Sequence, residues 1–543
     1  MSNRPSTGRD GQACRCRLQP AEWAAQEPAL KVVASLLDRS PGHVTSDEKT
    51  FGAPVYALPS LHGPMARDVI PDHPMDARAA YQVLQDILDL NGRPGLNLAS
   101  FVTTYCEPEA AQIMAETANL NAIDLDEYPA INAIENRCVH ILANLFNGPT
   151  SSADAASCVG VSTIGSSEAI ILATLAMKRR WKNLREAAGQ DATKPNFVMG
   201  ANVQVAWEKC LRYLEIEPRL VYCSSDQLCM DVAKAADLVD ENTVGVCAIL
   251  GSTYTGEYED VQGLNDLLEA RRRKDASITA MIHVDAASGG FVAPFVAPDL
   301  VWDFRLPLVA SINVSSHKYG FCLPGIGWAL WRSHDFLPKE LVFSVDYLGS
   351  PQMTFTLNFS KSSSPICMAY YVLIRYGRAG YRRVMEGLYK TATMLTQAIA
   401  SMGLFRTLSK IDPHEGLPLV SFALANPKDH AWDEFDLAHQ LRQRGWILPA
   451  YHMAPHAEGQ KLVRVVLRQD FSYNRGELFL ADLKHAVDAL NEMDTAHLEH
   501  QRRHAKAMQA WSSVLRRGSH VSKGKSHSDV GGVIDHKGNL GVC

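Results

Sequence analysis

The feature that most constrains this chain is an alternation of short apolar runs with helical stretches between about residues 96 and 390. The apolar runs are five to eight residues long: NFVMG, PRLVYC, TVGVCAIL, ITAMIHV and PLVASINV. Strands that are apolar throughout are typical of parallel sheets whose two faces are both covered by helices. The sequence therefore predicts an α/β fold with a mostly parallel, doubly covered sheet.

The 543-residue chain is long enough for two or three domains. Residues 1–95 are irregular apart from one expected helix, DARAAYQVLQDILDL, and the opening residues are polar, rich in breakers and expected to be partly disordered. We expect a large domain over 96–388 and a smaller α+β domain over 389–495. A basic tail follows over 496–543, and from residue 500 onward eight Lys and Arg face two Asp and Glu.

Composition excludes several classes of protein. A formal net charge of −6 argues against nucleic-acid binding, and no run of 18 uncharged apolar residues exists to span a membrane. The twelve cysteines are scattered, and the close pair Cys14 and Cys16 has no second pair at zinc-ligand spacing, so no metal is expected. With no signal peptide visible, we expect reduced thiols and a cytoplasmic protein.

Polar side chains follow three of the predicted strands at the point where each strand ends. Ser252 and Thr253 follow one run, Asp285 ends the next, and His317 and Lys318 follow the third. Because open α/β sheets bind ligands at the carboxyl ends of their strands, we expect these side chains to meet in one crevice. Taken singly, each has an ordinary explanation: the aspartate as a turn residue and the histidine as an interior one.

A Gly-Ser-Ser turn opens a strongly helical stretch in VSTIGSSEAIILATLAMKRR. Gly165, Ser166 and Ser167 there offer free N–H groups, hydroxyls and the positive end of a helix dipole to an anion. The alternative is simple helix capping by Ser166 or Ser167, with Glu168 in the first turn. A phosphate site and a plain cap remain open at this point.

Lys318 sits where a lysine is costly, between a hydroxyl-rich run and an apolar, glycine-punctuated stretch. Burial favours the neutral amine, and a neutral amine forms a Schiff base with an aldehyde. The Asp285 carboxylate is suited to keep a pyridine nitrogen protonated. The Gly-Ser-Ser turn is suited to hold a phosphate. An aldehyde, a pyridine and a phosphate together describe pyridoxal 5'-phosphate. The interpretation is that Lys318 is buried because it anchors this cofactor.

Five motifs resemble glutamate decarboxylases, group II decarboxylases of the pyridoxal-phosphate fold-type I class: HVDAASGGFVAPF, SSHKYG, TIGSSEA, TYTGEYE and LVFSVDYLG. The resemblance covers about residues 90 to 490. It implies a transferase-like large domain built on a seven-stranded type of sheet and a smaller C-terminal domain. It also implies decarboxylation of L-glutamate to 4-aminobutyrate and carbon dioxide through a Schiff base on Lys318.

The resemblance assigns further roles to matching positions. Asp285 is expected to pair with the pyridine nitrogen, Gln204 to lie against the ring, and Thr253 to contact the cofactor near Asp285. The phosphate is expected to be held by Ser166, Ser167 and His317, with Ser360 donated by a neighbouring subunit. That last contact implies a homodimer or higher oligomer with a shared active site. Tyr347, in LVFSVDYLG, is expected either to cover the site or simply to pack.

The same resemblance implies two grips on the substrate. Arg464, in LVRVVLRQDF, matches the arginine that clamps the α-carboxylate, although a surface arginine on an alternating strand is the alternative. Ser100, Asn121 and Asp124 fall on positions that meet the distal carboxylate. Ser100 stands where threonine is expected. Asp124 needs to be protonated or to act through its neighbours, which favours an acidic optimum.

Two rival interpretations and the tail stay open. A decarboxylase of another amino acid would keep Lys318 and Asp285, and a non-catalytic relative would be expected to lose Lys318, Asp285 or Arg464, which are all present. Residues 500–518 have the pattern of a basic amphipathic helix with a tryptophan, typical of calmodulin targets. The alternative is a helix that docks on its own subunit.

Overall fold

The computed structural model describes residues 55–63, 69–149, 157–345, 352–503, and 505 and 506. The chain forms two compact units, one ending at Asn91 and the other beginning at Gly92. In the described part of the first unit, helix α2 (Ala77–Leu88) confirms the helix expected there. Its N-terminus is capped by the Asp76 side chain, which accepts hydrogen bonds from the first turn of the helix.

The second unit is built on a seven-stranded sheet with the order β1-β7-β6-β5-β4-β2-β3. Its strands are β1 (Val159–Thr163), β2 (Asn196–Gly200), β3 (Glu217–Val221), β4 (Thr243–Ile249), β5 (Met281–Asp285), β6 (Val309–Val314) and β7 (Gly327–Trp331). The strands β3, β2, β4, β5 and β6 run parallel to one another. Every residue of β4, β5 and β6 is buried, which explains why these strands are mostly apolar in the sequence.

The two strands β1 and β7 are absent from the strands predicted above, and both pair antiparallel. β7 returns beside β6 after the segment 315–326, which contains Lys318. An antiparallel return needs no crossover helix, so the alternation of strand and helix that reveals the parallel strands is absent here. The large sheet is therefore mostly parallel, as predicted, with an antiparallel edge.

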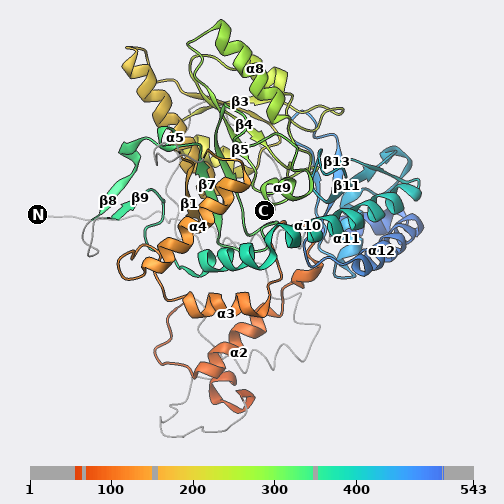
Figure 1. The fold of residues 1–543 in the computed structure, drawn as a ribbon. Coiled ribbons are helices and arrows are strands. Elements are labelled where there is room, and N and C mark those ends of the chain that lie inside the picture. Colours follow the sequence, from red (N-terminus) through yellow and green to blue (C-terminus); the bar gives the residue numbers. More distant parts are fainter. Residues whose placement is uncertain (1–54, 64–68, 150–156, 346–351, 504, 507–543) are drawn as a thin grey trace, which may run out of the picture. The chain divides into compact units, whose positions relative to one another are not determined.

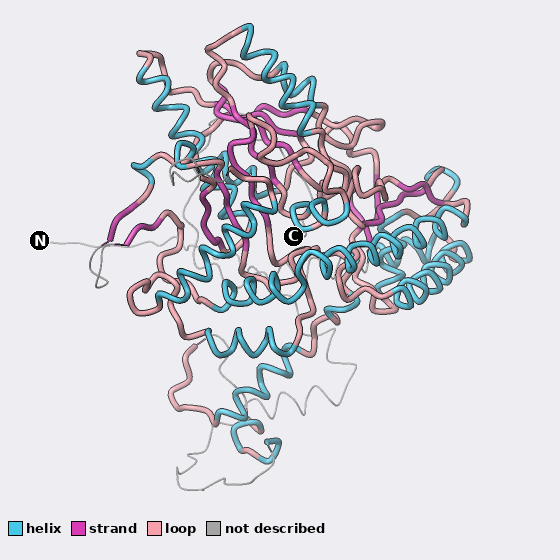
Figure 2. Tube along the Cα trace, in the orientation of Figure 1, coloured by secondary structure: helices cyan, strands magenta, loops and turns pink. Residues whose placement is uncertain are grey.

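Helices flank this sheet (Figures 1 and 2). The helices of this part of the chain are α3 (Pro108–Thr117), α4 (Pro129–Leu145), α5 (Ser166–Ala187), α6 (Val205–Tyr213), α7 (Val232–Asp237), α8 (Val261–Lys274), α9 (Ala293–Val296) and α10 (Ser364–Ser401). α5 packs across five strands of the sheet, from β1 and β7 to β4. α4 packs against β1 and β7, and α10 packs against α3, α4 and α9. Figure 2 shows the strands of the large sheet side by side with helices around them.

A second, four-stranded sheet belongs to the smaller C-terminal part and has the order β10-β11-β13-β12, antiparallel throughout. Its elements are β10 (Phe405–Thr407), β11 (Leu419–Leu424), β12 (Ala450–His452), β13 (Lys461–Val466), α11 (Glu434–Arg442) and α12 (Tyr473–Glu492). A two-stranded ribbon, β8 (Phe343–Val345) with β9 (Gln352–Thr354), stands apart from both sheets. The expected α+β character of this smaller part is thus observed.

The helical stretch 495–503 begins the tail, and its Arg502 side chain binds the Asp436 carboxylate of α11 at 3.0 Å through Nε. Arg502 is therefore engaged within its own chain. The remaining tail from residue 507 and the Tyr347 loop position lie outside the described residues. Within the described part of the chain, no helix combines the length and apolar character needed to cross a membrane.

Candidate active site

The ends of β4, β5 and β6 bring the predicted polar residues to one edge of the large sheet. Asp285, the last residue of β5, lies between Ile249 of β4 and Asn313 of β6 in the register of the sheet. His317 and Lys318 follow β6 within four residues. The order of parallel strands thus places these side chains together although they are far apart in sequence.

The Asp285 carboxylate is buried and receives three hydrogen bonds. Trp207 Nε1 donates to Oδ2 at 2.8 Å, Asn313 Nδ2 donates to Oδ1 at 2.9 Å, and the Ala287 backbone N–H donates to Oδ1 at 3.2 Å. Three donors and no acceptor suit an ionised carboxylate, which can only accept. Trp207 and Asn313 are not among the site residues that the sequence predicts.

Lys318 is half-buried, so the expectation of an enclosed lysine is corrected. Its Nζ lies 3.5 Å from the Ser288 hydroxyl and 5.6 Å from the centre of the Phe101 ring. Its backbone is fixed separately, because the Thr103 hydroxyl donates to the Lys318 carbonyl at 2.7 Å. A reactive amine has to be reachable by its substrate, and partial exposure gives that access while the backbone stays anchored.

An anion site forms where α5 begins. Gly165 precedes the helix with a φ of 156°, and Ser166 and Ser167 are its first residues. The Ser166 hydroxyl hydrogen-bonds the hydroxyl of Ser315, which precedes the His-Lys pair. The His317 ring lies against this turn, since a Cβ added at Gly165 would stand 3.0 Å from His317 Cε1. Backbone N–H groups, hydroxyls and an imidazole thus converge on one helix N-terminus.

The His317 ring carries a second sign of a ligand. Its Nδ1 is buried and has no hydrogen-bond partner within the described residues. Burial, helped by the nearby Lys318 charge, lowers the pKa of His317 to about 4, so the free protein holds a neutral imidazole at neutral pH. A buried ring nitrogen without a partner next to a helix N-terminus fits a ligand with anionic oxygens.

Two further predicted residues line the same edge. Gln204 follows β2, caps α6, and accepts from the Ala206 backbone N–H at 2.6 Å through its side-chain oxygen. Thr253 follows β4 and is half-buried, and its carbonyl oxygen accepts a hydrogen bond from the Arg464 guanidinium. Each lies beyond the carboxyl end of its strand, as expected.

Arg464 on β13 is only 2% exposed, so the alternative of a surface arginine is wrong. Its guanidinium donates to the carbonyls of Thr253 and Ala99, and its centre lies 4.7 Å from the centre of the Phe101 ring. Its Nε is buried without a partner among the described residues. The Lys318 amine contacts the same Phe101 ring, so an arginine of the small sheet and the lysine that follows β6 both lie beside one aromatic side chain.

The residues expected to meet the distal carboxylate fall into two places. Ser100 is next to Phe101, and its hydroxyl accepts from the Val102 N–H at 3.1 Å. Asn121 Nδ2 donates to Asp124 Oδ1 at 3.1 Å, while Asn121 Oδ1 accepts from the Lys361 N–H at 3.2 Å. Asn121 and Asp124 therefore lie with the segment that carries Ser360, and Ser360 itself is exposed.

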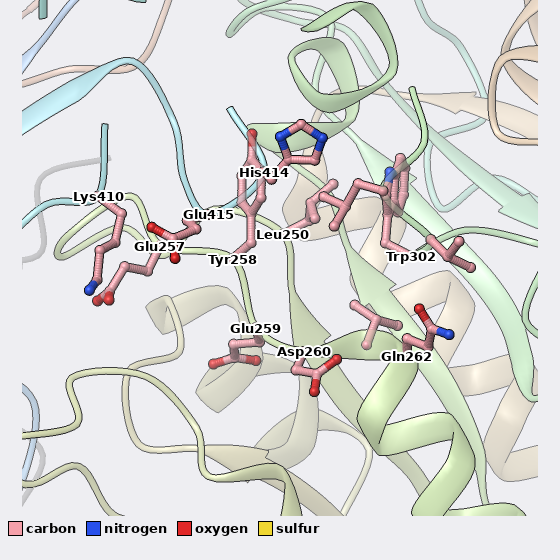
Figure 3. Close-up of a pocket in the computed structure, with 13 residues that line it drawn as sticks. Leu250, Glu257, Tyr258, Glu259, Asp260, Gln262, Trp302, Lys410, His414 and Glu415 are labelled. Carbon is pink, nitrogen blue, oxygen red and sulfur yellow. The ribbon is translucent and has the colours of Figure 1, made fainter. Parts of the chain in front are cut away.

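A separate cavity of about 320 Å³ lies beyond the turn after β4 (Figure 3). Its walls include acidic and basic side chains, among them Glu257, Asp260, Lys410 and His414. Neither Lys318 nor Asp285 nor Arg464 lines it. The reactive edge of the sheet is therefore identified by its chemistry and not by this cavity.

Pyridoxal phosphate has an aldehyde, a pyridine nitrogen and a phosphate, and the edge of the sheet offers a partner for each. The reachable amine of Lys318, the buried carboxylate of Asp285 and the anion site at α5 fit the three groups. The fold and the site together define a pyridoxal-phosphate enzyme.

Comparison with known proteins narrows that class. Residues 74–425 match the family model described as the pyridoxal-dependent decarboxylase conserved domain. The chain belongs to this family. It is 49% identical to a glutamate decarboxylase of Petunia hybrida over 86% of this chain and 90% of that one. It is 41% identical to one of Lactococcus lactis subsp. cremoris over 83% and 96%.

A solved structure gives the same picture. The glutamate decarboxylase of Lactobacillus brevis superimposes with a TM-score of 0.77 at 40% identity, covering 81% of this chain and 99% of that one. A rice enzyme solved as TDC with PLP and tryptamine has a TM-score of 0.66 at 16% identity, which shows a shared fold alone. The seven-stranded, pyridoxal-dependent fold expected from the motifs is thus confirmed.

Proposed function

We propose that this chain decarboxylates L-glutamate to 4-aminobutyrate and carbon dioxide with pyridoxal 5'-phosphate as cofactor. The observation that carries the proposal is the buried Arg464, which contacts the same Phe101 ring as the Lys318 amine. A planar guanidinium there offers a bidentate grip to a carboxylate beside the reactive amine. Glutamate is favoured as substrate by the glutamate decarboxylases that share 41% to 49% identity with this chain.

The cofactor would be held by the residues at the edge of the sheet. Lys318 would attach covalently to its aldehyde, Asp285 would pair with the pyridine nitrogen, and Gln204 and Thr253 would line the ring. The anion site would hold the phosphate through Ser166, Ser167 and His317. Bound pyridoxal phosphate supplies an electron sink for the bond that breaks.

The remaining residues would orient the substrate. Arg464 would hold the α-carboxylate and so select which bond at Cα is cleaved, an effect of orientation. Ser100 would contribute a hydroxyl to the distal carboxylate, and Asn121 and Asp124 an amide and a carboxyl group. The Asn121–Asp124 hydrogen bond supports a paired arrangement in which the amide tempers the negative charge.

The substrate is tested with a panel of amino acids. Purified protein loaded with pyridoxal phosphate is expected to release carbon dioxide and 4-aminobutyrate in equal amounts from L-glutamate. Aspartate, aromatic and basic amino acids are expected to give roughly a hundredth of that rate or less, since they leave the distal grip unpaired. An enzyme that prefers another amino acid would retain the cofactor assignment and overturn the substrate. A protein inactive on every member of the panel would favour the non-catalytic alternative.

We also propose a homodimer or higher oligomer with a shared active site. Ser360 is exposed in the single chain, and the N–H of the next residue, Lys361, is bound by Asn121. These residues would therefore complete the site of a neighbouring subunit. Such sharing has a clear consequence for mixed oligomers.

The test mixes two inactive variants, Lys318→Ala and Ser360→Asp, in a 1:1 ratio before refolding or co-expression. If Ser360 acts in the neighbouring subunit, mixed dimers hold one intact site of two, and activity recovers to roughly a quarter of wild type. If Ser360 acts within its own chain, no intact site forms and the mixture stays inactive. A mixture of each variant with itself is the control.

Two further proposals concern the surroundings of the enzyme. Residues 500–518 would bind calmodulin, although the Arg502–Asp436 ion pair places the start of this segment on its own chain. A calcium-dependent gel shift of the full chain with calmodulin tests this, and its absence favours the docked helix.

We also assign the enzyme to the cytoplasm, which is supported by the nine free thiols among the described cysteines. Fractionation of the source cells checks that assignment.

A further inference from the structure

The Asp285 carboxylate is the end of a buried chain of polar side chains that runs along β5 and β6. His283 lies two residues before Asp285 on β5, so both side chains point to the same side of the sheet. Their register partners on β6 are Ser311 and Asn313. His283, Ser311 and Asn313 are fully buried, and Asp285 is 6% exposed.

Three hydrogen bonds connect the four side chains in series. Asn313 Nδ2 lies 2.9 Å from Asp285 Oδ1, and Asn313 Oδ1 lies 2.7 Å from His283 Nε2. His283 Nδ1 lies 2.8 Å from the Ser311 hydroxyl. Polar groups buried to this degree are costly unless paired, and here each member finds a partner on the neighbouring strand.

The chemistry of the groups fixes the direction of each bond. A carboxylate only accepts, so Asn313 has to turn its amide nitrogen toward Asp285 and its oxygen toward His283. His283 Nε2 must then carry the hydrogen that this oxygen accepts. Burial lowers the pKa of His283 and favours the neutral ring, whose Nδ1 then accepts from the Ser311 hydroxyl. The four groups have one consistent arrangement of hydrogens.

The other carboxylate oxygen is held from a different element. Trp207 of α6 donates to Asp285 Oδ2 at 2.8 Å, and its ring meets the His283 ring edge-on with centroids 5.4 Å apart. Trp207 therefore contacts both the Asp285 carboxylate and the His283 ring, which is the central member of the hydrogen-bonded series. With both oxygens engaged, the carboxylate has little freedom to rotate.

We propose that His283 and Asn313 are positioning residues that hold Asp285 ionised and aimed at the pyridine nitrogen of the cofactor. The inference rests on the proposed role of Asp285 and extends it to residues that touch neither substrate nor cofactor. His283 locks the amide of Asn313, the amide fixes Oδ1, and the carboxylate keeps a charge that stabilises a protonated pyridine. No proton needs to move along the chain for this effect.

The test compares pairs of variants at the two positions. Asn313→Leu is expected to lower kcat by about 10- to 100-fold, the size of one lost hydrogen bond to a charged group, with little change in KM for glutamate. His283→Leu is expected to act in the same direction, because it removes the partner that fixes the Asn313 amide. The absorption spectrum of the bound cofactor is expected to change with pH at a different midpoint in both variants. His283→Gln keeps an N–H donor and is expected to restore most of the loss. Ile312→Val, on the other side of the same strand, is the control and should resemble wild type.

Two results overturn the proposal. The first is that the leucine variants lower thermal stability alone, with unchanged kcat, spectrum and cofactor affinity, because the chain would then serve only the core. The second comes from wild-type protein labelled with nitrogen-15 histidine, with His283→Gln used for assignment. The proposal requires hydrogen on Nε2 and none on Nδ1 of His283 at neutral pH, and the opposite tautomer contradicts it. This measurement stands even if a leucine variant fails to fold.

The Asp285→Asn variant separates this inference from the function on which it rests. If Asp285→Asn is inactive while Asn313→Leu and His283→Leu behave as wild type, the proposed positioning role of His283 and Asn313 is wrong and the proposed role of Asp285 stands. If Asp285→Asn retains full activity, the proposed role of Asp285 is wrong, and so is the positioning role of His283 and Asn313 that depends on it.

Discussion

Replacing Lys318 with alanine is expected to remove activity by at least about 10³-fold, because the chain then lacks the amine that would bind the cofactor covalently. The visible absorbance that pyridoxal phosphate gains on attachment to an amine is expected to vanish as well. Carbon dioxide release from glutamate and the spectrum of the loaded protein measure the two effects. The backbone around Lys318 should survive the change, since the Thr103 hydroxyl binds the carbonyl of residue 318 rather than its side chain.

Lys461 provides a matched control for that experiment. It too is half-buried, with its amine 5.8 Å from the centre of the Phe435 ring and 2.7 Å from the Asp433 carboxylate. Lys461→Ala is expected to cost at most about 1 kcal/mol of stability and to leave the cofactor spectrum unchanged. An active, coloured Lys318→Ala protein would falsify the covalent anchor and the interpretation of the whole edge.

The central strands could be predicted because burial on both faces leaves a plain signal. β4, β5 and β6 are mostly apolar, and polar residues at or just after their last positions mark the ends of the strands. Asp285 and Lys318 can therefore be recognised as candidates from the amino-acid sequence alone. β7 gives no such signal, because it returns antiparallel beside β6 through a short connection rather than through a crossover helix. β1 is a short edge strand that is only partly buried, so it lacks a continuous apolar run.

The partners of the candidate residues are much harder to foresee. Asn313 meets Asp285 only because the pairing of β5 with β6 shifts by one residue between Ile282 and His283, and without that shift another residue would lie opposite Asp285. Trp207 reaches the same carboxylate from a helix 78 positions away in sequence. Sequence patterns report which face of an element is apolar, whereas these contacts depend on how separate elements are placed.

Arg464 shows a different limit of pattern reasoning. On an alternating strand an arginine is expected to face solvent, yet here the strand is covered on both sides and the guanidinium is buried. The resemblance to the decarboxylases identifies this residue where alternation does not. Its two carbonyl partners come from separate loops, at Thr253 and Ala99, so the position cannot be reconstructed from local sequence.

Arg464→Lys is expected to lower kcat/KM for glutamate by roughly 10²- to 10³-fold while the protein stays folded and coloured. Lysine keeps the charge but loses the planar fork that binds a carboxylate through two parallel hydrogen bonds, each worth about 1.5–3 kcal/mol to a charged group. Most of the loss should appear in KM, with a further fall in kcat because a less firmly held carboxylate is less well oriented. Steady-state kinetics with glutamate measures both.

Arg332→Lys separates a lost substrate contact from a disturbed arginine site. Arg332 also donates to backbone carbonyls, at 2.8 Å to Val309 and 2.9 Å to Phe304, and lies 5.6 Å from the centre of the Phe304 ring. Its replacement should lower the melting temperature and leave KM unchanged, because it holds the core rather than the site. If Arg464→Lys likewise changes stability alone, Arg464 is a structural tie between the loops at Ala99 and Thr253, and the α-carboxylate must be bound by another residue.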